Sequence, residues 1–193
     1  MEDIRTVILP LPSIELVKEK EEEWCIDLPS SFKEFIIRYN GIIPKKNLFK
    51  ISDDKEYVIE RFLCILDDFE ENSLGMYDID VIWSPILEIL SVDPDSVGVE
   101  LLPVATLFGG DFICLDYREG PQNPKVCYWK REDSYEWHPS VEFVSETFED
   151  FLGMLYSEDD IANSWYLVTE SCFRSLGRRY KINRKDLMFN NGI

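Results

Sequence analysis

Carboxylates are the residues of this sequence whose number and spacing could support chemistry. Asp53-Asp54 and Asp67-Asp68 are adjacent pairs, and two carboxyl groups, one with a raised pKa, can serve as the acid and the base of a glycosidase. Such pairs also arise by chance in a chain with 38 Asp and Glu residues. A carboxylate-dependent hydrolase is therefore kept only as a third hypothesis.

A weak calcium-loop pattern runs from Asp93 to Gly98. Its alternating acids, Asp93 and Asp95, could present oxygen atoms to a hard cation, but Val97 replaces one oxygen donor. Val104 also stands where the bidentate glutamate of such a loop belongs. We interpret this segment as an ordinary loop.

Other catalytic or metal-binding side chains are scarce. The chain has one histidine, His138, so histidine acid–base chemistry and multi-histidine metal sites have little to draw on. The five cysteines form no Cys-x-x-Cys pair, and all except Cys25 lie in apolar runs, which is typical of small buried residues in a reducing compartment. No phosphate-binding glycine loop or Gly-x-Ser-x-Gly elbow occurs. We therefore expect no enzymatic activity, no cofactor and no metal.

The net charge of −18 restricts the class of partner. It repels phosphate backbones and anionic lipid head groups, so we expect no direct nucleic-acid binding and no membrane binding. Neither a signal peptide nor a membrane span follows Met1–Arg5, and we expect a cytoplasmic protein. A negative surface attracts basic partners and speeds their capture, although the charge could also serve solubility alone.

The clearest elements that must position these residues lie in the middle of the chain. Two apolar runs, 101–108 and 111–117, are separated only by Gly109-Gly110. This predicts a hairpin with a two-residue turn, because glycine adopts positive φ without strain. A third strand is predicted over Lys125–Lys130. These three antiparallel strands are the expected nucleus of the fold.

The second run is apolar on both of its faces. Phe112 and Cys114 face one way, and Ile113, Leu115 and Tyr117 face the other. This predicts a central strand that is covered on both sides. Asp116 ends the run and needs a partner, which is either Arg118 in the following turn or a residue of another protein.

Two helices are predicted before the hairpin. Ser13 caps the first, Ile14–Trp24, and we expect Ile14, Val17 and Trp24 on its buried side. The second follows Pro29 and ends at Asn40-Gly41, with a capping box formed by Ser31 and Glu34. Its buried face is predicted from the i, i+3, i+4, i+7 spacing of Phe32, Phe35, Ile36 and Tyr39.

The remaining elements are predicted from shorter patterns. They are strands at Leu48–Ile51 and Tyr57–Leu66, with 60–66 left open between strand and helix; helical spacing over 78–90; a polar turn at 133–138; a short strand at 141–144; and a helix that Ser145 caps, with a stripe of Phe148, Phe151, Leu152 and Leu155. Residues 157–193 hold six basic and five acidic side chains, unlike the acidic part before them.

These patterns together predict an α+β fold. We expect a mixed, mainly antiparallel sheet with a central hairpin packed against helices, in one domain at residues 1–156. Residues 157–193 are predicted to form a helical C-terminal extension that packs on this domain.

Two segments carry a resemblance to a known family. Leu28-Pro29, Phe32 and Tyr39-Asn40-Gly41 resemble the first signature of the SUKH superfamily, the cell-wall-assembly-regulator-like domain. The glycine turn and apolar strand at 109–117, followed by 124–129, resemble its second signature. The resemblance implies an α+β fold that usually lacks enzymatic activity. Many bacterial members are immunity proteins that neutralise a secreted toxin, often a nuclease, and fungal members act in cell-wall signalling.

Three hypotheses follow. The first is an immunity protein, monomer or weak homodimer, that binds a basic toxin domain stoichiometrically through acidic loops. The alternative is an intracellular scaffold or regulatory module without a toxin partner, and the third is the hydrolase above. The candidate partner-binding residues are Asp53, Asp54, Asp67, Asp68, Glu70, Glu71 and Asp116.

Overall fold

The computed structural model describes residues 6–52, 55–84, 101–135 and 138–160. The chain divides into two compact units, Met1–Leu155 and Tyr156–Ile193. The sheet and the helices that pack against it belong to the first unit. The predicted extension lies, from residue 161 onward, outside the described residues. So do the segment 93–98, which we interpret as an ordinary loop, and the second half of the helical pattern at 78–90.

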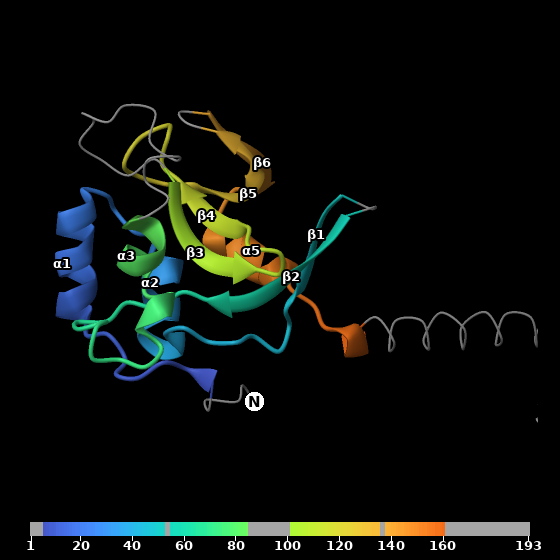
Figure 1. The fold of residues 1–193 in the computed structure, drawn as a ribbon. Coiled ribbons are helices and arrows are strands. Elements are labelled where there is room, and N and C mark those ends of the chain that lie inside the picture. The colour runs from blue at the N-terminus through green and yellow to red at the C-terminus, as the bar shows by residue number, and fades with distance from the viewer. Residues whose placement is uncertain (1–5, 53–54, 85–100, 136–137, 161–193) are drawn as a thin grey trace, which may run out of the picture. The chain divides into compact units, whose positions relative to one another are not determined.

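Six strands form one curled sheet in which each strand pairs with the next along the chain (Figure 1). They are β1 (Leu48–Ser52), β2 (Lys55–Phe62), β3 (Leu101–Leu107), β4 (Phe112–Asp116), β5 (Lys125–Tyr135) and β6 (His138–Ser145). All five strand pairs are antiparallel, and a single isolated parallel bridge joins Cys64 to Asp78. The predicted α+β class and mainly antiparallel sheet are confirmed.

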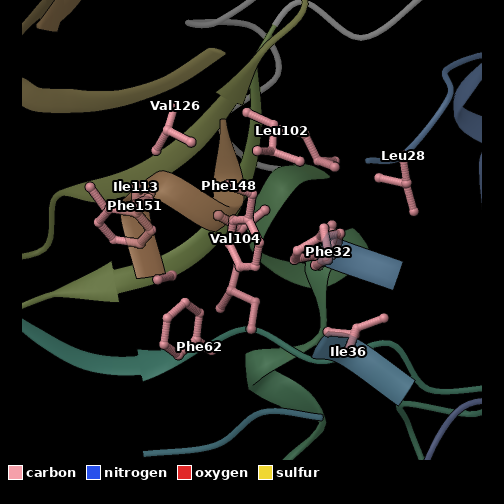
Figure 2. Packing of buried hydrophobic residues seen from close by; sticks show 14 of the residues in the cluster. Leu28, Phe32, Ile36, Phe62, Leu102, Val104, Ile113, Val126, Phe148 and Phe151 are labelled. Atoms are coloured by element: carbon pink, nitrogen blue, oxygen red, sulfur yellow. The ribbon is translucent and has the colours of Figure 1, made fainter. Parts of the chain in front are cut away.

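Helical segments pack against this sheet. They are α1 (Ile14–Trp24), α2 (Ser30–Tyr39), the 3-10 turn η2 (Gly75–Tyr77), α3 (Ile79–Trp83) and α5 (Phe148–Met154). Helix α3 contacts the apolar clusters on both faces of the sheet through Ile82 and Trp83. Helices α2 and α5 meet through Phe32 and Phe148, whose rings lie edge to face 5.0 Å apart. Figure 2 shows these rings with Phe62 of β2 and Phe151 of α5 in the main core.

Strand β4 is buried on both faces, as predicted. Ile113, Leu115 and Tyr117 belong to the main core under the helices. Phe112 and Cys114 belong to a second cluster on the opposite face, with Leu101, Cys127 and Trp129. An antiparallel sheet with both faces covered lets a strand be apolar at every position. Three of the four described cysteines, Cys64, Cys114 and Cys127, are buried and free, which confirms their predicted role as small core residues.

The central hairpin has a longer turn than predicted. Strand β3 ends at Leu107 and β4 begins at Phe112, with the Leu107 amide donating to the Asp111 carbonyl at 2.9 Å. Gly109 and Gly110 do have positive φ, at 106° and 88°. The predicted two-residue turn is wrong because the Phe108 amide instead donates to Val58 of β2, at 3.0 Å, which removes Phe108 from the β3–β4 pair.

Helix α1 has the predicted bounds and the predicted cap. The Ser13 hydroxyl accepts from the Leu16 amide at 3.0 Å, and Val17 and Trp24 are buried. Ile14, however, is 69% exposed, so its predicted burial is wrong. At 100° per residue it lies about 70° around the axis from the centre of the face that Val17 and Trp24 define.

Two predicted caps are also wrong. Helix α2 begins at Ser30 with Pro29 as its N-cap residue, so Ser31 already lies inside the first turn and caps nothing. Helix α5 is capped by Thr147, whose hydroxyl accepts from the Asp150 amide at 3.1 Å. Ser145 is the last residue of β6. The predicted polar turn at 133–138 belongs largely to β5 and β6, because the strands extend farther than their apolar residues do.

Candidate functional site

Four of the seven candidate acids lie in one exposed loop. Asp67, Asp68, Glu70 and Glu71 follow the buried strand-like segment that ends at Leu66, and all four are exposed. One carboxylate oxygen of Asp68 accepts from the amides of Glu70 and Glu71, at 3.0 and 3.1 Å. The loop therefore presents its charges from a defined backbone.

Gly75 lies directly against the backbone of this loop at Phe69. A Cβ atom at Gly75 would lie 1.9 Å from the carbonyl oxygen of Phe69, a distance no side chain tolerates. The amide of Gly75 also donates to the Asn72 carbonyl at 2.9 Å. Glycine at this position thus allows the acidic loop to pack directly against the start of η2.

The N-terminal arm, residues 6–12, runs beside this loop. The Asn72 side-chain amide donates to the Leu9 carbonyl oxygen at 2.6 Å. Ile8 is 1% exposed and packs with Cys64 and Leu66 in a small cluster that Tyr77 also contacts. The arm and the loop, about sixty residues apart in sequence, are therefore held together by both polar and apolar contacts.

Asn40 is the buried residue that joins these parts. Its side-chain nitrogen lies 3.3 Å from the Ile8 and Pro10 carbonyl oxygens and 3.1 Å from that of Ile65. Its side-chain oxygen accepts from the Ile65 amide at 2.8 Å. From the sequence, Asn40 was predicted at the end of a helix and within the family signature, but not as a buried contact between distant segments. The sequence signal for this burial was an amide side chain that is followed by a glycine and lies among apolar residues.

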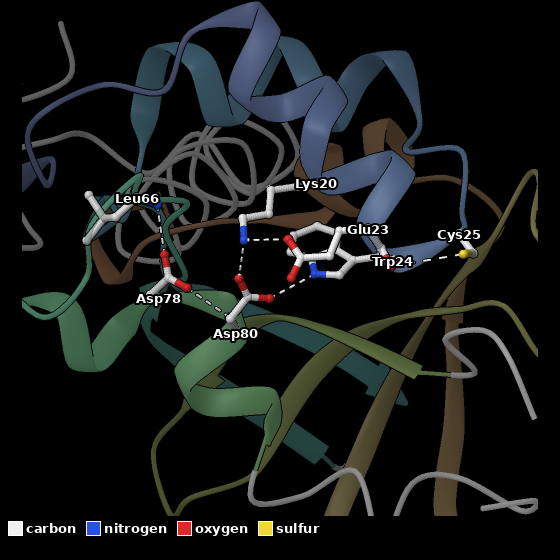
Figure 3. Close-up of polar contacts among 7 residues, drawn as sticks. All are labelled: Lys20, Glu23, Trp24, Cys25, Leu66, Asp78 and Asp80. Carbon is white, nitrogen blue, oxygen red and sulfur yellow. Dashed lines mark hydrogen bonds and ion pairs between the residues drawn. The ribbon is translucent and has the colours of Figure 1, made fainter. Parts of the chain in front are cut away.

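A second polar cluster fastens α1 to α3 (Figure 3). Asp80 accepts from Lys20 Nζ at 2.6 Å and from the indole nitrogen of Trp24 at 2.8 Å. Burial lowers the pKa of Lys20, but its hydrogen bonds to Asp80 and Glu23 outweigh this and leave that pKa raised. The polar groups of these four side chains bind one another, so we interpret the cluster as a structural clamp between α1 and α3.

Asp78 lies beneath this clamp as the N-cap of α3. Its two oxygens accept from the amides of Asp80 and Leu66, at 2.9 and 2.8 Å. Burial raises the pKa of Asp78 to about 6, and the two backbone hydrogen bonds partly oppose that rise. The side chain is only 1% exposed and both of its oxygens accept from backbone amides, so its role is to hold the segment that leads into the acidic loop.

Asp116 belongs to the part of the sheet near the C-terminal end of α1, because the hydroxyl of the next residue, Tyr117, donates to the Asp27 carbonyl at 3.1 Å. Arg118 donates to the two oxygens of Asp116, from Nε at 2.9 Å and from Nη2 at 2.6 Å, which is the partner within the chain that sequence analysis considered. The turn after β4 is tied to the C-terminal end of α1, because the Asp27 amide donates to the Pro121 carbonyl at 2.9 Å. The arm precedes the N-terminal end of the same helix, about 16 Å away. Asp116 therefore does not join the acidic loop in one surface.

The other predicted residues do not converge on a site. Asp53 and Asp54 lie outside the described residues. His138 is exposed and stacks on Tyr135, with ring centres 4.7 Å apart. No group of three His, Cys, Asp or Glu side chains in the described part could hold a metal ion.

Two hollows of the described surface also lack a reactive pair. One, of about 380 Å³, has an apolar lining that includes Phe35 and Leu152, with Lys45 and Lys46 but no carboxylate. The other, beside Cys25, is lined by three carboxylates, Glu21, Glu22 and Asp27, and each has a partner within the chain. One oxygen of Glu21 accepts from the Leu28 amide at 2.7 Å and from Lys33 at 2.9 Å. Glu22 lies 3.8 Å from Lys18, and Asp27 accepts from the Gln122 side-chain amide at 2.7 Å. The Asp67-Asp68 pair borders neither hollow.

Comparison with known proteins identifies the family. A family model described as SMI1-KNR4 cell-wall, of the SUKH type, matches residues 14–152. The chain belongs to the SUKH family. This confirms the resemblance drawn from the sequence, and SUKH proteins are associated with protein–protein interaction and with immunity to toxins.

One curated relative of this SUKH protein is an SPbeta prophage-derived uncharacterized protein, YokK, of Bacillus subtilis strain 168. The two are 27% identical over 159 residues, which cover 76% of this chain and 78% of the relative. No solved structure gives a significant match. None of the helices in the described part combines the length and the apolar character that a bilayer crossing requires.

Proposed function

We propose that this SUKH protein is an immunity protein that neutralises a cognate toxin, a nuclease domain with a basic substrate-binding surface. It acts without catalysis, by binding the toxin stoichiometrically in the cytoplasm. The observation that carries the proposal is the exposed acidic loop at 67–71, held in a fixed shape by Asp68 on a fold of this family. A fixed acidic surface binds a basic one with little loss of conformational entropy.

The charge of the whole chain supports the same partner. With a net charge of −18 it attracts basic proteins over long distances and repels nucleic acid, so it does not compete for the toxin's substrate. A nuclease must present positive charge to its phosphate backbone substrate. An acidic inhibitor that covers this positive surface blocks activity without a chemical step.

The test is an inhibition assay with the protein that the adjacent gene encodes. Purified full-length chain is titrated into a fixed amount of that protein, and both complex formation and nuclease activity are measured. We expect activity to fall linearly and to vanish near a molar ratio of one. A matched titration with an unrelated acidic protein of similar net charge controls for inhibition by charge alone.

Two results would overturn the proposal. Inhibition that requires a large molar excess would exclude a stoichiometric inhibitor. A complex with a non-toxic protein would instead support the alternative hypothesis, an intracellular regulatory module without a toxin partner.

A further inference from the structure

Exposed apolar side chains of this protein gather in one region. Eleven large hydrophobic residues are exposed in the described part of the chain, and six of them come from residues 9–14 and 69–76. These six are Leu9, Leu11, Ile14, Phe69, Leu74 and Met76. Single exposed apolar residues need no explanation, but several from two segments in contact mark an interaction surface.

The two segments lie against each other. The hydrogen bond from Asn72 to the Leu9 carbonyl, at 2.6 Å, joins them directly, and Ile8 packs with Leu66 just before the acidic loop. Figure 1 shows the N-terminal arm and the loop before η2 at the same end of the first unit. We call the exposed side chains of residues 9–15 and 67–76 the arm–loop face.

We propose that the arm–loop face is the docking surface for a basic protein partner that carries apolar side chains among its positive charges. This inference rests on the proposed function and names the part of the chain that contacts the toxin. The charges of the face specify the partner, since its two segments also carry five exposed acids, Glu15, Asp67, Asp68, Glu70 and Glu71. Apolar anchors supply affinity when they are desolvated, and the acids around them supply orientation and speed of capture.

Other occupants fit the face less well. A second copy, related by a two-fold axis, would place the acids of one copy against the same acids of the other, which is repulsive. An anionic membrane would be repelled for the same reason. A basic protein surface is the occupant whose charge complements that of the face.

The test compares two pairs of substitutions in the full-length chain. The double variant I14S/M76S removes apolar side chains that are 69% and 64% exposed, so the fold does not depend on them. The double variant E70Q/E71Q removes charge and keeps Asp68, which holds the turn. The matched controls, F108S/F143S and E132Q/E146Q, change residues outside the arm–loop face that are also exposed.

The first probe is a synthetic helical peptide of lysine and leucine, paired with a lysine and serine peptide of the same charge. We expect the lysine–leucine peptide to bind the wild-type chain and to bind I14S/M76S about tenfold more weakly. E70Q/E71Q should weaken both peptides, whereas the control variants should bind like wild type. Hydrogen exchange should show protection in residues 9–15 and 67–76.

The second probe is the protein that the adjacent gene encodes, measured with the same variants. If the wild-type chain inhibits this protein and the face variants do so equally well, the arm–loop face is excluded while the proposed function stands. If the wild-type chain does not inhibit it, the proposed function fails, and the peptide measurements still decide the face. Four results would overturn the inference. They are peptide protection elsewhere, no peptide binding, dimerisation through the face, and intramolecular crosslinks from the face to the basic side chains of residues 157–193.

Discussion

At the scale of single residues, buried polar side chains determine how the acidic loop is held. Asn40 binds the N-terminal arm on one side and the segment at Ile65 on the other. Asp78 fixes the Leu66 amide, directly before the loop. Both are almost completely buried. If either side chain is removed, the backbone groups that it binds lose a hydrogen bond that water cannot replace.

Replacing Asn40 should therefore be costly. We expect Asn40→Ala to lower the free energy of unfolding by about 3 kcal/mol, because it leaves the Ile65 amide and several carbonyl groups unsatisfied. Asn72→Ala is the matched control and should cost about 1 kcal/mol, since Asn72 is partly exposed to water. Urea unfolding measures both, and equal losses would contradict the special role of Asn40.

Asp78 should give the stability a specific pH dependence. Its pKa in the folded state, about 6, lies above the ordinary value of 3.8 that applies when the chain is unfolded. Between these values the folded state holds a proton that the unfolded state has released, so the contribution of Asp78 to stability is present below pH 4 and is lost as the pH rises through 6.

The variant Asp78→Asn tests this sign. It lacks one of the two acceptors and should be less stable than wild type, but it does not titrate. We expect the advantage of wild type over this variant to shrink, by about 2 kcal/mol, between pH 4 and pH 7. Unfolding curves at several pH values measure it. A constant difference would show that Asp78 keeps its ordinary pKa.

At the scale of elements, the helix ends show which of the predicted capping residues make a hydrogen bond. Ser13 and Ser31 stand in similar positions, each near the start of an apolar helical stripe. Only Ser13 precedes its helix and accepts a backbone hydrogen bond, because Pro29 sets the start of α2 two residues earlier than a cap at Ser31 requires. One sequence pattern thus has two structural outcomes.

Substitution by alanine should separate the two serines. We expect Ser13→Ala to lower the free energy of unfolding by about 1 kcal/mol, since it removes the cap of α1. Ser31→Ala should change it by less than about 0.5 kcal/mol, because alanine favours the helix interior. Thermal or urea unfolding gives both values, and a larger loss at Ser31 would restore the predicted capping box.

At the scale of the whole molecule, the net charge of −18 governs how partners arrive. Long-range attraction between opposite charges raises the rate of association, and salt screens it beyond roughly 10 Å. The same charge disfavours self-association, and we keep the prediction of a monomer or weak homodimer. The acidic loop adds local contacts to this general attraction.

Complex formation with the adjacent gene's product should therefore depend on salt through its on-rate. We expect the association rate constant to fall about tenfold between 50 and 500 mM NaCl, with a much smaller change in the dissociation rate constant. Stopped-flow fluorescence measures the first and surface plasmon resonance the second. An association rate that ignores salt would contradict capture by charge.

Much of the scaffold could be predicted from local patterns. Spacings of a few residues were enough to predict the bounds of α1, the two buried faces of β4 and the antiparallel pairing of β3, β4 and β5. The reason is that apolar residues recur with the period of the helix or strand that buries them. The acidic loop and the net charge were also visible in the sequence. These features do not require knowledge of distant neighbours.

The tertiary structure alone decided which distant residues meet. Leu9 and Asn72 are 63 positions apart, and the Phe108 amide binds β2 instead of its own hairpin partner. The exposure of Ile14, which lies off the centre of the buried face of α1, likewise depends on how far the neighbouring elements cover that helix. The sequence by itself determined the helices, the strands and their charge. The packing of those elements decided which side chains share a surface, because contacts between distant segments are set by the whole fold.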